Sequence, residues 1–262
     1  MSSIGWLDLD GVVNMRDVGG LPTRDGGTTR SGRLLRSDNL QDLSPDDIRH
    51  LVDVIGVSDI VDLRSNAEYH VEGPGPLTRT DLTHHRHSLF RDDETEVSVE
   101  DALVLPWQRE DTRERLRSHD EDYWASHYLG YLADRPDSVA AALEVVATAT
   151  GATVVHCAAG KDRTGTVVGI ALAVAGVPEE HIVADYVATA ERIERIVERL
   201  STRPAYADNL RGRPLDDHLP RPETMTRILE VLEQRHGGAE GWLVGQGWSE
   251  EQVERLRARL TR

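Results

Sequence analysis

The stretch His156-Cys157-Ala158-Ala159-Gly160-Lys161-Asp162-Arg163-Thr164-Gly165 holds the single cysteine and the single lysine of this 262-residue chain, in the pattern HCxxGxxRTG. Residues 152–155 before it are apolar and mostly β-branched, which is typical of a buried strand. Residues 166–174 after it are apolar over more than two helical turns. The stretch therefore predicts a strand, a short loop and the N-terminus of a buried helix.

A loop in this position forms an anion site from its backbone alone. Its N–H groups converge on one point, and the positive end of the helix dipole adds to their attraction. Glycines within the loop allow the backbone to approach a ligand closely. We therefore expect phosphate to bind to the backbone of Ala158, Ala159, Gly160, Lys161 and Gly165.

The same electrostatic field favours a nucleophilic cysteine. Because a cysteine at a helix N-terminus beside a guanidinium ionises readily, we expect Cys157 to be a thiolate at neutral pH. Arg163 offers a planar fork that two phosphate oxygens can share, which a lysine could not imitate. Thr164 places a hydroxyl where it can hydrogen-bond the sulfur and ease its departure. His156 is expected to hold the loop in shape through backbone hydrogen bonds.

Two other interpretations of the stretch fit less well. A buried structural cysteine does not account for Gly160, Arg163 and Thr164 at their fixed offsets. A nucleotide-binding P-loop is suggested by the pair Gly160-Lys161. That motif requires Ser or Thr where Asp162 stands, and a glycine five residues before Gly160.

The chain is 39% hydrophobic and long enough to bury a full core, which predicts one domain over residues 1–262, with one domain plus an appended helical piece as the alternative. No stretch approaches the ~20 apolar residues of a membrane span, and the first residues lack a basic region followed by an apolar run. A lone cysteine suits a reducing compartment, so we expect a cytoplasmic location, with export by another route as the alternative. The formal net charge of −16 argues against nucleic-acid binding.

The order of elements predicts an α/β fold. Strands are expected at 32–36 and 58–63, and the helix between them starts at Ser44-Pro45, so the strands should pair in parallel. Residues 91–122 are crowded with charge and are predicted to be a solvated or mobile insert. Further helices are expected at 123–132, 136–149, 179–200, 222–236 and 249–260.

Residues 201–222 hold four prolines and several arginines, a composition typical of a linker or lid. The expected architecture is a central, mostly parallel sheet with helices on both faces. A helical lid-like insertion near residues 190–222 follows the active-site helix.

These motifs resemble those of the bacterial tyrosine/serine protein phosphatase family, within the cysteine-dependent protein-tyrosine phosphatase superfamily. The GKDRTG ending at residues 160–165 carries the likeness most specifically. Residues 14–20 resemble the family's NxRDxGG element, 35–38 its RS segment and 61–68 its DLRSxxE element, in the family's order. The resemblance implies phosphomonoester hydrolysis through a phosphocysteine, without cofactor or metal. It also implies a helical cover over the active site, and a place for Arg16 and Asp17 in the pocket wall.

The resemblance further implies that Asp162, inside the loop, is the general acid, because relatives with an aspartate there are proposed to use it. Asp62 and Asp38 remain alternatives, since both follow strands whose ends face the loop. Helix caps and turn hydrogen bonds are the structural alternative for these two carboxylates.

Lys161 should face the substrate, where its charge would favour multiply phosphorylated inositol lipids over a phosphopeptide; an ordinary surface lysine is the alternative. His84, His85 and His87 raise the question of a metal, because the last two share a strand face. No third ligand stands at a recognisable spacing, so a polar strand edge is the default interpretation.

The sequence thus predicts a metal-independent phosphatase that acts on a phosphorylated protein or a phosphoinositide through Cys157. The competing classes are a phosphate-recognising binding module without turnover and a sulfur transferase. The intact set Cys157, Asp162, Arg163 and Thr164 argues against the binding module. The sequence does not separate phosphotyrosine, phosphoserine and phosphoinositide as substrates.

Overall fold

The computed structural model describes residues 4–91 and 105–262. Within these ranges the centre is a six-stranded sheet in the order β1-β2-β3-β6-β4-β5. Strands β3, β6, β4 and β5 run parallel, and β1 and β2 add antiparallel at one edge. The predicted mostly parallel sheet is therefore confirmed. The strands are β1 Gly5–Trp6, β2 Arg16–Asp17, β3 Leu34–Ser37, β4 Val57–Asp62, β5 Thr83–Arg86 and β6 Ala152–His156.

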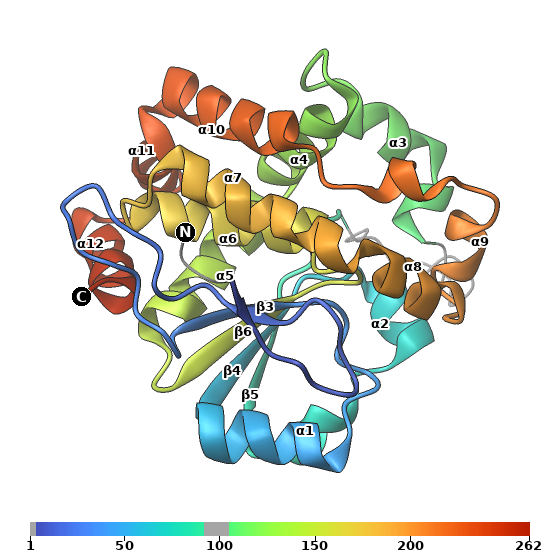
Figure 1. The fold of residues 1–262 in the computed structure, drawn as a ribbon. Coiled ribbons are helices and arrows are strands. Elements are labelled where there is room, and N and C mark those ends of the chain that lie inside the picture. The colour runs from blue at the N-terminus through green and yellow to red at the C-terminus, as the bar shows by residue number, and fades with distance from the viewer. Residues whose placement is uncertain (1–3, 92–104) are drawn as a thin grey trace.

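Helices cover both faces of the sheet. Helix α1 and the π-helical turn η1 lie on one face, and α5, α6, α7 and α12 lie on the other (Figure 1). The α-helices are α1 Pro45–Arg49, α2 Asn66–Glu72, α3 Glu110–Leu116, α4 Tyr123–Asp134, α5 Pro136–Thr148, α6 Asp162–Val174, α7 Glu179–Ala188, α8 Ile193–Ser201, α9 Ala207–Leu210, α10 Pro222–His236, α11 Gly238–Gly245 and α12 Glu250–Leu260. The other helical turns are η1 His50–Ile55, η2 Pro76–Arg79, η4 Pro106–Gln108, η5 Thr189–Arg192 and η6 Leu215–His218.

The apolar runs of the strands explain why both faces are covered. Successive residues point to opposite faces, so Val154 packs into the core beneath α1 while Val155 packs into the core of α4 to α7. In β3, Leu34 packs into the core of α4 to α7 and Leu35 into the core beneath α1. A strand that buries both faces must read as continuously apolar, as residues 152–155 do.

The helix predicted from Ser44 begins as expected, but its second half differs in geometry. Ser44 and Asp47 form a reciprocal capping box, with Pro45 at the first helical position. After Arg49 the α-helix widens into the π-helical turn η1, which the sequence did not predict. Gly56 ends it at φ 75°, a left-handed conformation that glycine adopts without strain.

The single helix predicted over 179–200 is wrong: α7, η5 and α8 replace it. Arg16 Nη2 donates to the carbonyl of Asp185 at 2.7 Å, the acceptor that the N–H of Thr189 would use in a continuous α-helix. That N–H bonds instead to Tyr186 and Val187. The chain tightens into the 3₁₀ turn η5 before α8 begins.

The solvated insert predicted over 91–122 is wrong for its later part, while residues 92–104 lie outside the described residues. Helices η4 and α3 form over Pro106–Leu116, and Leu105 and Leu116 are buried. Ser126 Oγ of α4 donates to the carbonyl of Leu116 at 2.8 Å and ties the two helices together. The buried Leu105 and Leu116, together with this hydrogen bond, dock a highly charged segment against α4.

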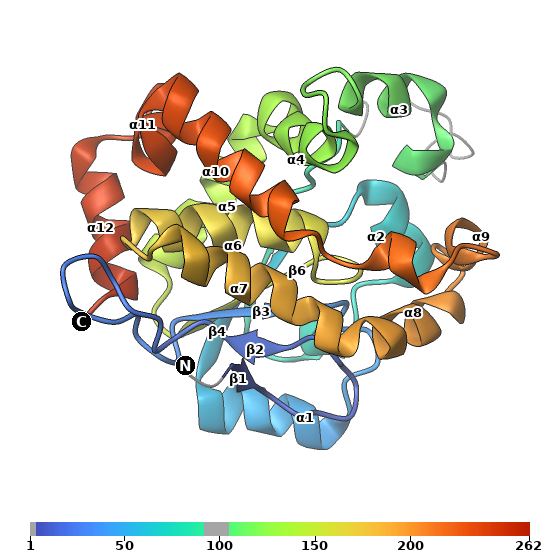
Figure 2. The same cartoon turned by 45° about the horizontal axis from the view of Figure 1, so that its top comes forward.

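Residues 201–222 form the short helices α9 and η6, joined by turns, beside α8 and α2 (Figure 2). The helices predicted at 222–236 and 249–260 are confirmed as α10 and α12, with the unpredicted α11 between them. In the part of the chain that the structure describes, no helix combines the length and the apolar character needed to cross a membrane.

Candidate active site

Three parallel strands bring the candidate residues together at their carboxyl ends. β3 ends at Ser37, β6 at His156 and β4 at Asp62, and β6 lies between the other two. The N–H of Leu63 donates to the carbonyl of His156 at 2.9 Å, which joins the segment after β4 to the start of the loop. Residues 157–161 then connect β6 to α6, as the sequence predicted.

Three successive carbonyls of the loop are held outward by hydrogen bonds from other segments. Because the N–H and C=O of a peptide point in opposite directions, this turns the following N–H groups to the inner side. The donors come from the loops before β2 and after β3 and from β3 itself. The bonds are Asn39 N to Ala158 O (2.9 Å), Asn14 Nδ2 to Ala159 O (2.8 Å) and Arg36 Nη2 to Gly160 O (2.7 Å).

Gly160 is required at the tightest point of the loop. Its φ is +66°, and a Cβ atom there would lie 2.4 Å from the carbonyl oxygen of Ser37. Gly165, one turn into α6, lies against the ring of Tyr186, where a Cβ would meet Cδ2 at 3.1 Å. The two glycines of the motif therefore allow the loop to pack against β3 and the helix against α7.

A buried Arg-Asp-Arg cluster supports this loop. Arg16 donates from Nε to Asp185 Oδ1 at 2.8 Å, and Arg36 Nη1 donates to Oδ2 of the same carboxylate. Burial and the neighbouring Arg36 lower the pKa of Arg16 to about 10, so it stays charged at neutral pH. Arg16 therefore holds Asp185, which in turn holds Arg36 against the loop; among the described residues, neither Arg16 nor Asp17 lines the cavity above the loop. Asp17 instead accepts from Gly19 N and Gly32 N and holds a turn.

Arg163 is fixed by a carboxylate to which sequence reasoning gave no role. Its Nη1 and Nη2 donate to Oε2 and Oε1 of Glu68 at 2.6 and 2.9 Å. Burial would raise the pKa of Glu68, but Arg163 holds it below its usual range. Glu68 also accepts from Ser65 N in the capping box that starts α2. The Ser-x-x-Glu spacing could have located the cap, but not the arginine that it holds.

Cys157 is buried, with 1% of its surface exposed. The Thr164 side chain is fully buried, and its Oγ1 makes no hydrogen bond to any residue that the structure describes. The expected bond from this hydroxyl to the sulfur is thus not formed here. Thr164 lies in the first turn of α6, directly after the loop, and its hydroxyl stays unpaired among the described residues.

His156 contacts the loop backbone as expected. Its Nδ1 lies 3.3 Å from the carbonyl oxygen of Cys157, and its Nε2 lies 3.7 Å from Asp62 Oδ1. Burial lowers the pKa of His156 to about 4 despite the nearby carboxylate, so the imidazole is neutral at pH 7.

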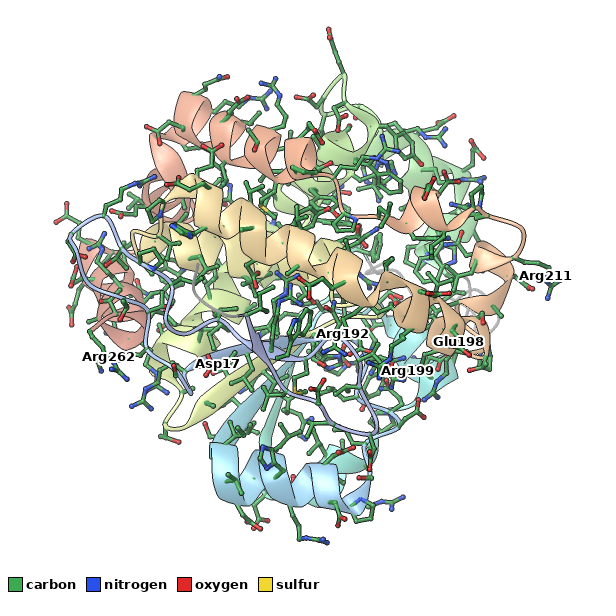
Figure 3. All side chains as sticks on the ribbon, in the orientation of Figure 1. Asp17, Arg192, Glu198, Arg199, Arg211 and Arg262 are labelled. Atoms are coloured by element: carbon green, nitrogen blue, oxygen red, sulfur yellow. The ribbon has the colours of Figure 1, made fainter. Side chains whose placement is uncertain are left out.

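Asp62 and Asp38, the alternative acids, are both engaged elsewhere. Asp62 binds the guanidinium of Arg64 through both oxygens, at 2.6 to 3.0 Å. Asp38 accepts from the N–H of Asn14 at 3.0 Å and from Arg199 Nη1 of α8, a residue labelled in Figure 3. Burial raises the pKa of Asp38. Within the described residues, neither carboxylate lines the cavity above the loop.

A cavity of about 630 Å³ opens above the loop, with Lys161, Asp162 and Arg163 in its wall. Aromatic rings line it from two sides, among them Trp124 of α4 and Tyr206 next to α9. Figure 2 shows α3 and α4 on one side of this region and α8 and α9 on the other, with α2 between them.

Lys161 belongs to this cavity and is not a surface lysine: only 7% of it is exposed. Its Nζ donates to the carbonyl of His218 in η6 at 2.8 Å and lies 3.5 Å from Asp162 Oδ1. It also lies 5.5 Å from the ring centre of Trp124, within the range of a cation–π contact.

His85 of β5 contacts an aspartate and the following His87. His85 Nε2 lies 2.8 Å from Asp59 Oδ1, and its ring stacks on that of His87 with centroids 6.2 Å apart, so the two do share one face. Across residues 4–91 and 105–262, no group of three or more His, Cys, Asp or Glu side chains is arranged to hold a metal ion.

Comparison with known proteins gives a consistent picture. Residues 7–262 match the model of a family described as the tyrosine phosphatase family. A tyrosine-protein phosphatase of Nostoc commune is 28% identical over 81% of this chain and 69% of its own length. The triple specificity protein phosphatase PtpB of Mycobacterium tuberculosis is 28% identical over 97% of this chain and 98% of its own.

One solved structure, the core catalytic domain of the PP-IP phosphatase SIW14 from S. cerevisiae, covers 78% of this chain and 98% of its own at 13% identity, with a TM-score of 0.38. At that TM-score the likeness to this structure is only partial. The assignment of the chain to a family therefore rests on the family match over residues 7–262.

Proposed function

We propose that this chain, which belongs to the tyrosine phosphatase family and is a cysteine-dependent phosphatase, hydrolyses phosphomonoesters through a phosphocysteine at Cys157. The sulfur attacks phosphorus in line with the leaving oxygen, the S–P bond forms and the P–O bond breaks. Water then attacks the phosphocysteine, which releases phosphate and restores the thiolate.

The observation that carries this proposal is the outward pull on the carbonyls of Ala158, Ala159 and Gly160. It turns successive N–H groups of residues 159–161 inward before any ligand binds, so that little reorganisation is needed when charge develops on the equatorial oxygens. Arg163 adds a guanidinium that Glu68 already orients. A preorganised cradle of this kind around a buried cysteine suits phosphoryl transfer.

Asp162 is proposed as the acid that protonates the leaving oxygen and as the base that later activates water. Its position supports this role, because it lines the cavity and keeps 28% of its side chain exposed, while Asp62 and Asp38 are engaged with Arg64 and Arg199. Thr164 would donate a hydrogen bond from its unpaired hydroxyl to the departing sulfur. His156 would hold the loop through the carbonyl oxygen of Cys157.

The proposed substrates are phosphotyrosine and phosphoserine in proteins, and phosphoinositides. A cavity of about 630 Å³ admits a ring together with part of a chain or headgroup, and Lys161 supplies a positive charge beside the loop. The relative PtpB is named for triple specificity. The kcat/KM values for a phosphotyrosine peptide, a phosphoserine peptide and a phosphoinositide should all be measurable, and activity confined to one class would contradict this breadth.

Chelation is expected to leave the rate unchanged. Arg163 and the loop amides supply the positive charge that a metallophosphatase takes from ions. Hydrolysis of an aryl phosphate should therefore proceed equally with and without EDTA, and vanadate should inhibit competitively as a mimic of five-coordinate phosphorus. Activity that is lost on chelation and restored by a divalent ion would refute the proposed mechanism and direct attention back to His85 and His87.

We further propose one phosphatase domain in which residues 190–222 act as a lid. Ile193 and Ile196 of α8 and the ring of Tyr206 pack in one apolar cluster with Ala158 of the loop. The Lys161–His218 bond also ties η6 of this segment to the loop that begins at the buried Cys157. Segments that bury an active site must open to admit a large substrate.

Loosening the lid should favour large substrates. Tyr206 is 4% exposed and its ring centre lies 6.0 Å from that of Trp107, so Tyr206→Ala should weaken closure. We expect kcat/KM for a phosphopeptide to rise severalfold relative to a small aryl phosphate. Tyr206→Phe is the matched control and should change neither value, because the hydroxyl has no partner among the described residues. Equal effects of Tyr206→Ala on kcat/KM for both substrates would refute the proposal that this segment is a lid.

A further inference from the structure

We infer that Tyr128 of α4 is a positioning residue for Asp162: it holds one carboxylate oxygen and leaves the other to carry the proton for the leaving group. The inference rests on the proposed role of Asp162 as the general acid. Tyr128 lies outside every motif of the sequence, 34 residues before Asp162.

A chain of hydrogen bonds assigns the direction of each proton. Tyr128 Oη lies 2.5 Å from Asp162 Oδ1, and Tyr186 Oη of α7 lies 2.8 Å from Tyr128 Oη. A carboxylate only accepts, so the hydroxyl proton of Tyr128 must point at Asp162. The oxygen of Tyr128 then accepts from Tyr186. The two tyrosines act in series, and only Tyr128 touches the acid.

Burial keeps Tyr128 a donor. Its side chain is 1% exposed, and burial, followed by the adjacent Asp162 carboxylate, raises the pKa of Tyr128 well above its usual value. The phenol therefore keeps its proton throughout the working range of the enzyme. Its hydrogen bond to a charged acceptor belongs to the stronger class.

The two oxygens of Asp162 are consequently unequal. Oδ1 receives the Tyr128 hydroxyl and lies 3.5 Å from Lys161 Nζ. Oδ2 receives no hydrogen bond from any residue in the described part of the chain, while the side chain stays partly open to the cavity. The proton of the acid form thus belongs on Oδ2, the oxygen that a leaving group in the cavity can reach.

Other titratable groups face Asp162, but they should not produce the same pH dependence. His127 and Tyr131 belong to α4, Tyr186 to α7, His218 to η6 and Lys161 to the loop. Burial lowers the pKa of both histidines, so each is neutral above pH 7. Burial also raises the pKa of Tyr131 and Tyr186, so both remain protonated.

Tyr128→Phe tests the inference through the pH profile of kcat/KM with an alkyl phosphate. A hydrogen bond donated to a carboxylate favours its charged form, so without it Asp162 should hold its proton to higher pH. The basic limb should move up by about one pH unit, as expected for loss of one bond to a charged group. Tyr131→Phe, one turn away on the same helix, should leave the limb where it is in the wild type.

Two further variants make the result decisive. Tyr186→Phe removes the hydroxyl that donates to Tyr128 and should shift the basic limb of the pH profile in the same direction, but by less. This variant also serves as the test if Tyr128→Phe fails to fold. In the Asp162→Asn background, Tyr128→Phe should cause no further loss, because the two act as a unit. If the basic limb of the pH profile moves neither in Tyr128→Phe nor in Tyr186→Phe, the inference is overturned. If Asp162→Asn shows no dependence on the leaving group, the proposed acid itself fails, which is a separate result.

Discussion

Replacing Cys157 with serine is expected to abolish turnover while the folded protein still binds phosphate. The hydroxyl of serine is a poor nucleophile without a base beside it. Among the described residues His156 does not take that place, because its imidazole is directed at a backbone oxygen and at Asp62. Loss of a catalytic nucleophile costs on the order of 10⁴-fold or more in kcat. The measurement is kcat with an activated aryl phosphate.

Binding provides the control for that variant. The inward N–H groups of residues 159–161 and the Arg163–Glu68 pair do not depend on the sulfur. Cys157→Ser should therefore bind a phosphopeptide with a Kd near that of the wild type, measured by calorimetry. Activity within tenfold of the wild type would contradict the mechanism, and a persulfide on Cys157 after thiosulfate treatment would support a sulfur transferase instead.

Replacing Asp162 with asparagine should slow hydrolysis in proportion to the basicity of the leaving group. An activated phenolate needs little protonation, whereas a serine alkoxide or an inositol oxygen needs nearly a full proton. We expect little loss with an activated aryl phosphate and about 10²–10³-fold more with an alkyl phosphate, within the range of general acid catalysis. The measurement is the slope of log kcat/KM against leaving-group pKa.

Asp62→Asn and Asp38→Asn are the controls for that slope. Asp62 holds Arg64, and Asp38 holds Arg199 and the N–H of Asn14. Each variant should lower the rate, where it does so at all, by a similar factor for every leaving group. A steep slope in one of these two variants and none in Asp162→Asn would place the acid outside the loop.

Local sequence signals predicted the strand, loop and helix around Cys157, because hydrophobic periodicity and glycine placement act over a few residues. The parallel sheet followed from the order of strands and helices. The break at Thr189 could not be predicted in this way, because it results from Arg16, which lies 173 residues away and takes a carbonyl from the helix.

The partners of the site residues could not be predicted either, because they too lie far away in the sequence. Glu68 and Tyr128 act on Arg163 and Asp162 across 95 and 34 residues. Their own surroundings in the sequence describe a helix cap and an apolar helix. Arg16, Arg36 and Asp185 likewise meet only in the folded chain. The sequence indicated the residues that we propose to carry the chemistry, and the fold identified those that hold them in place.

The stereochemical course at phosphorus tests the central claim most directly. Transfer to Cys157 and then to water involves two in-line displacements, each of which inverts phosphorus. An aryl phosphorothioate made chiral with oxygen isotopes and hydrolysed in isotopically labelled water should therefore give chiral thiophosphate with overall retention. This result does not depend on which step is slower. Inversion, the outcome of direct attack by water, would contradict the phosphocysteine.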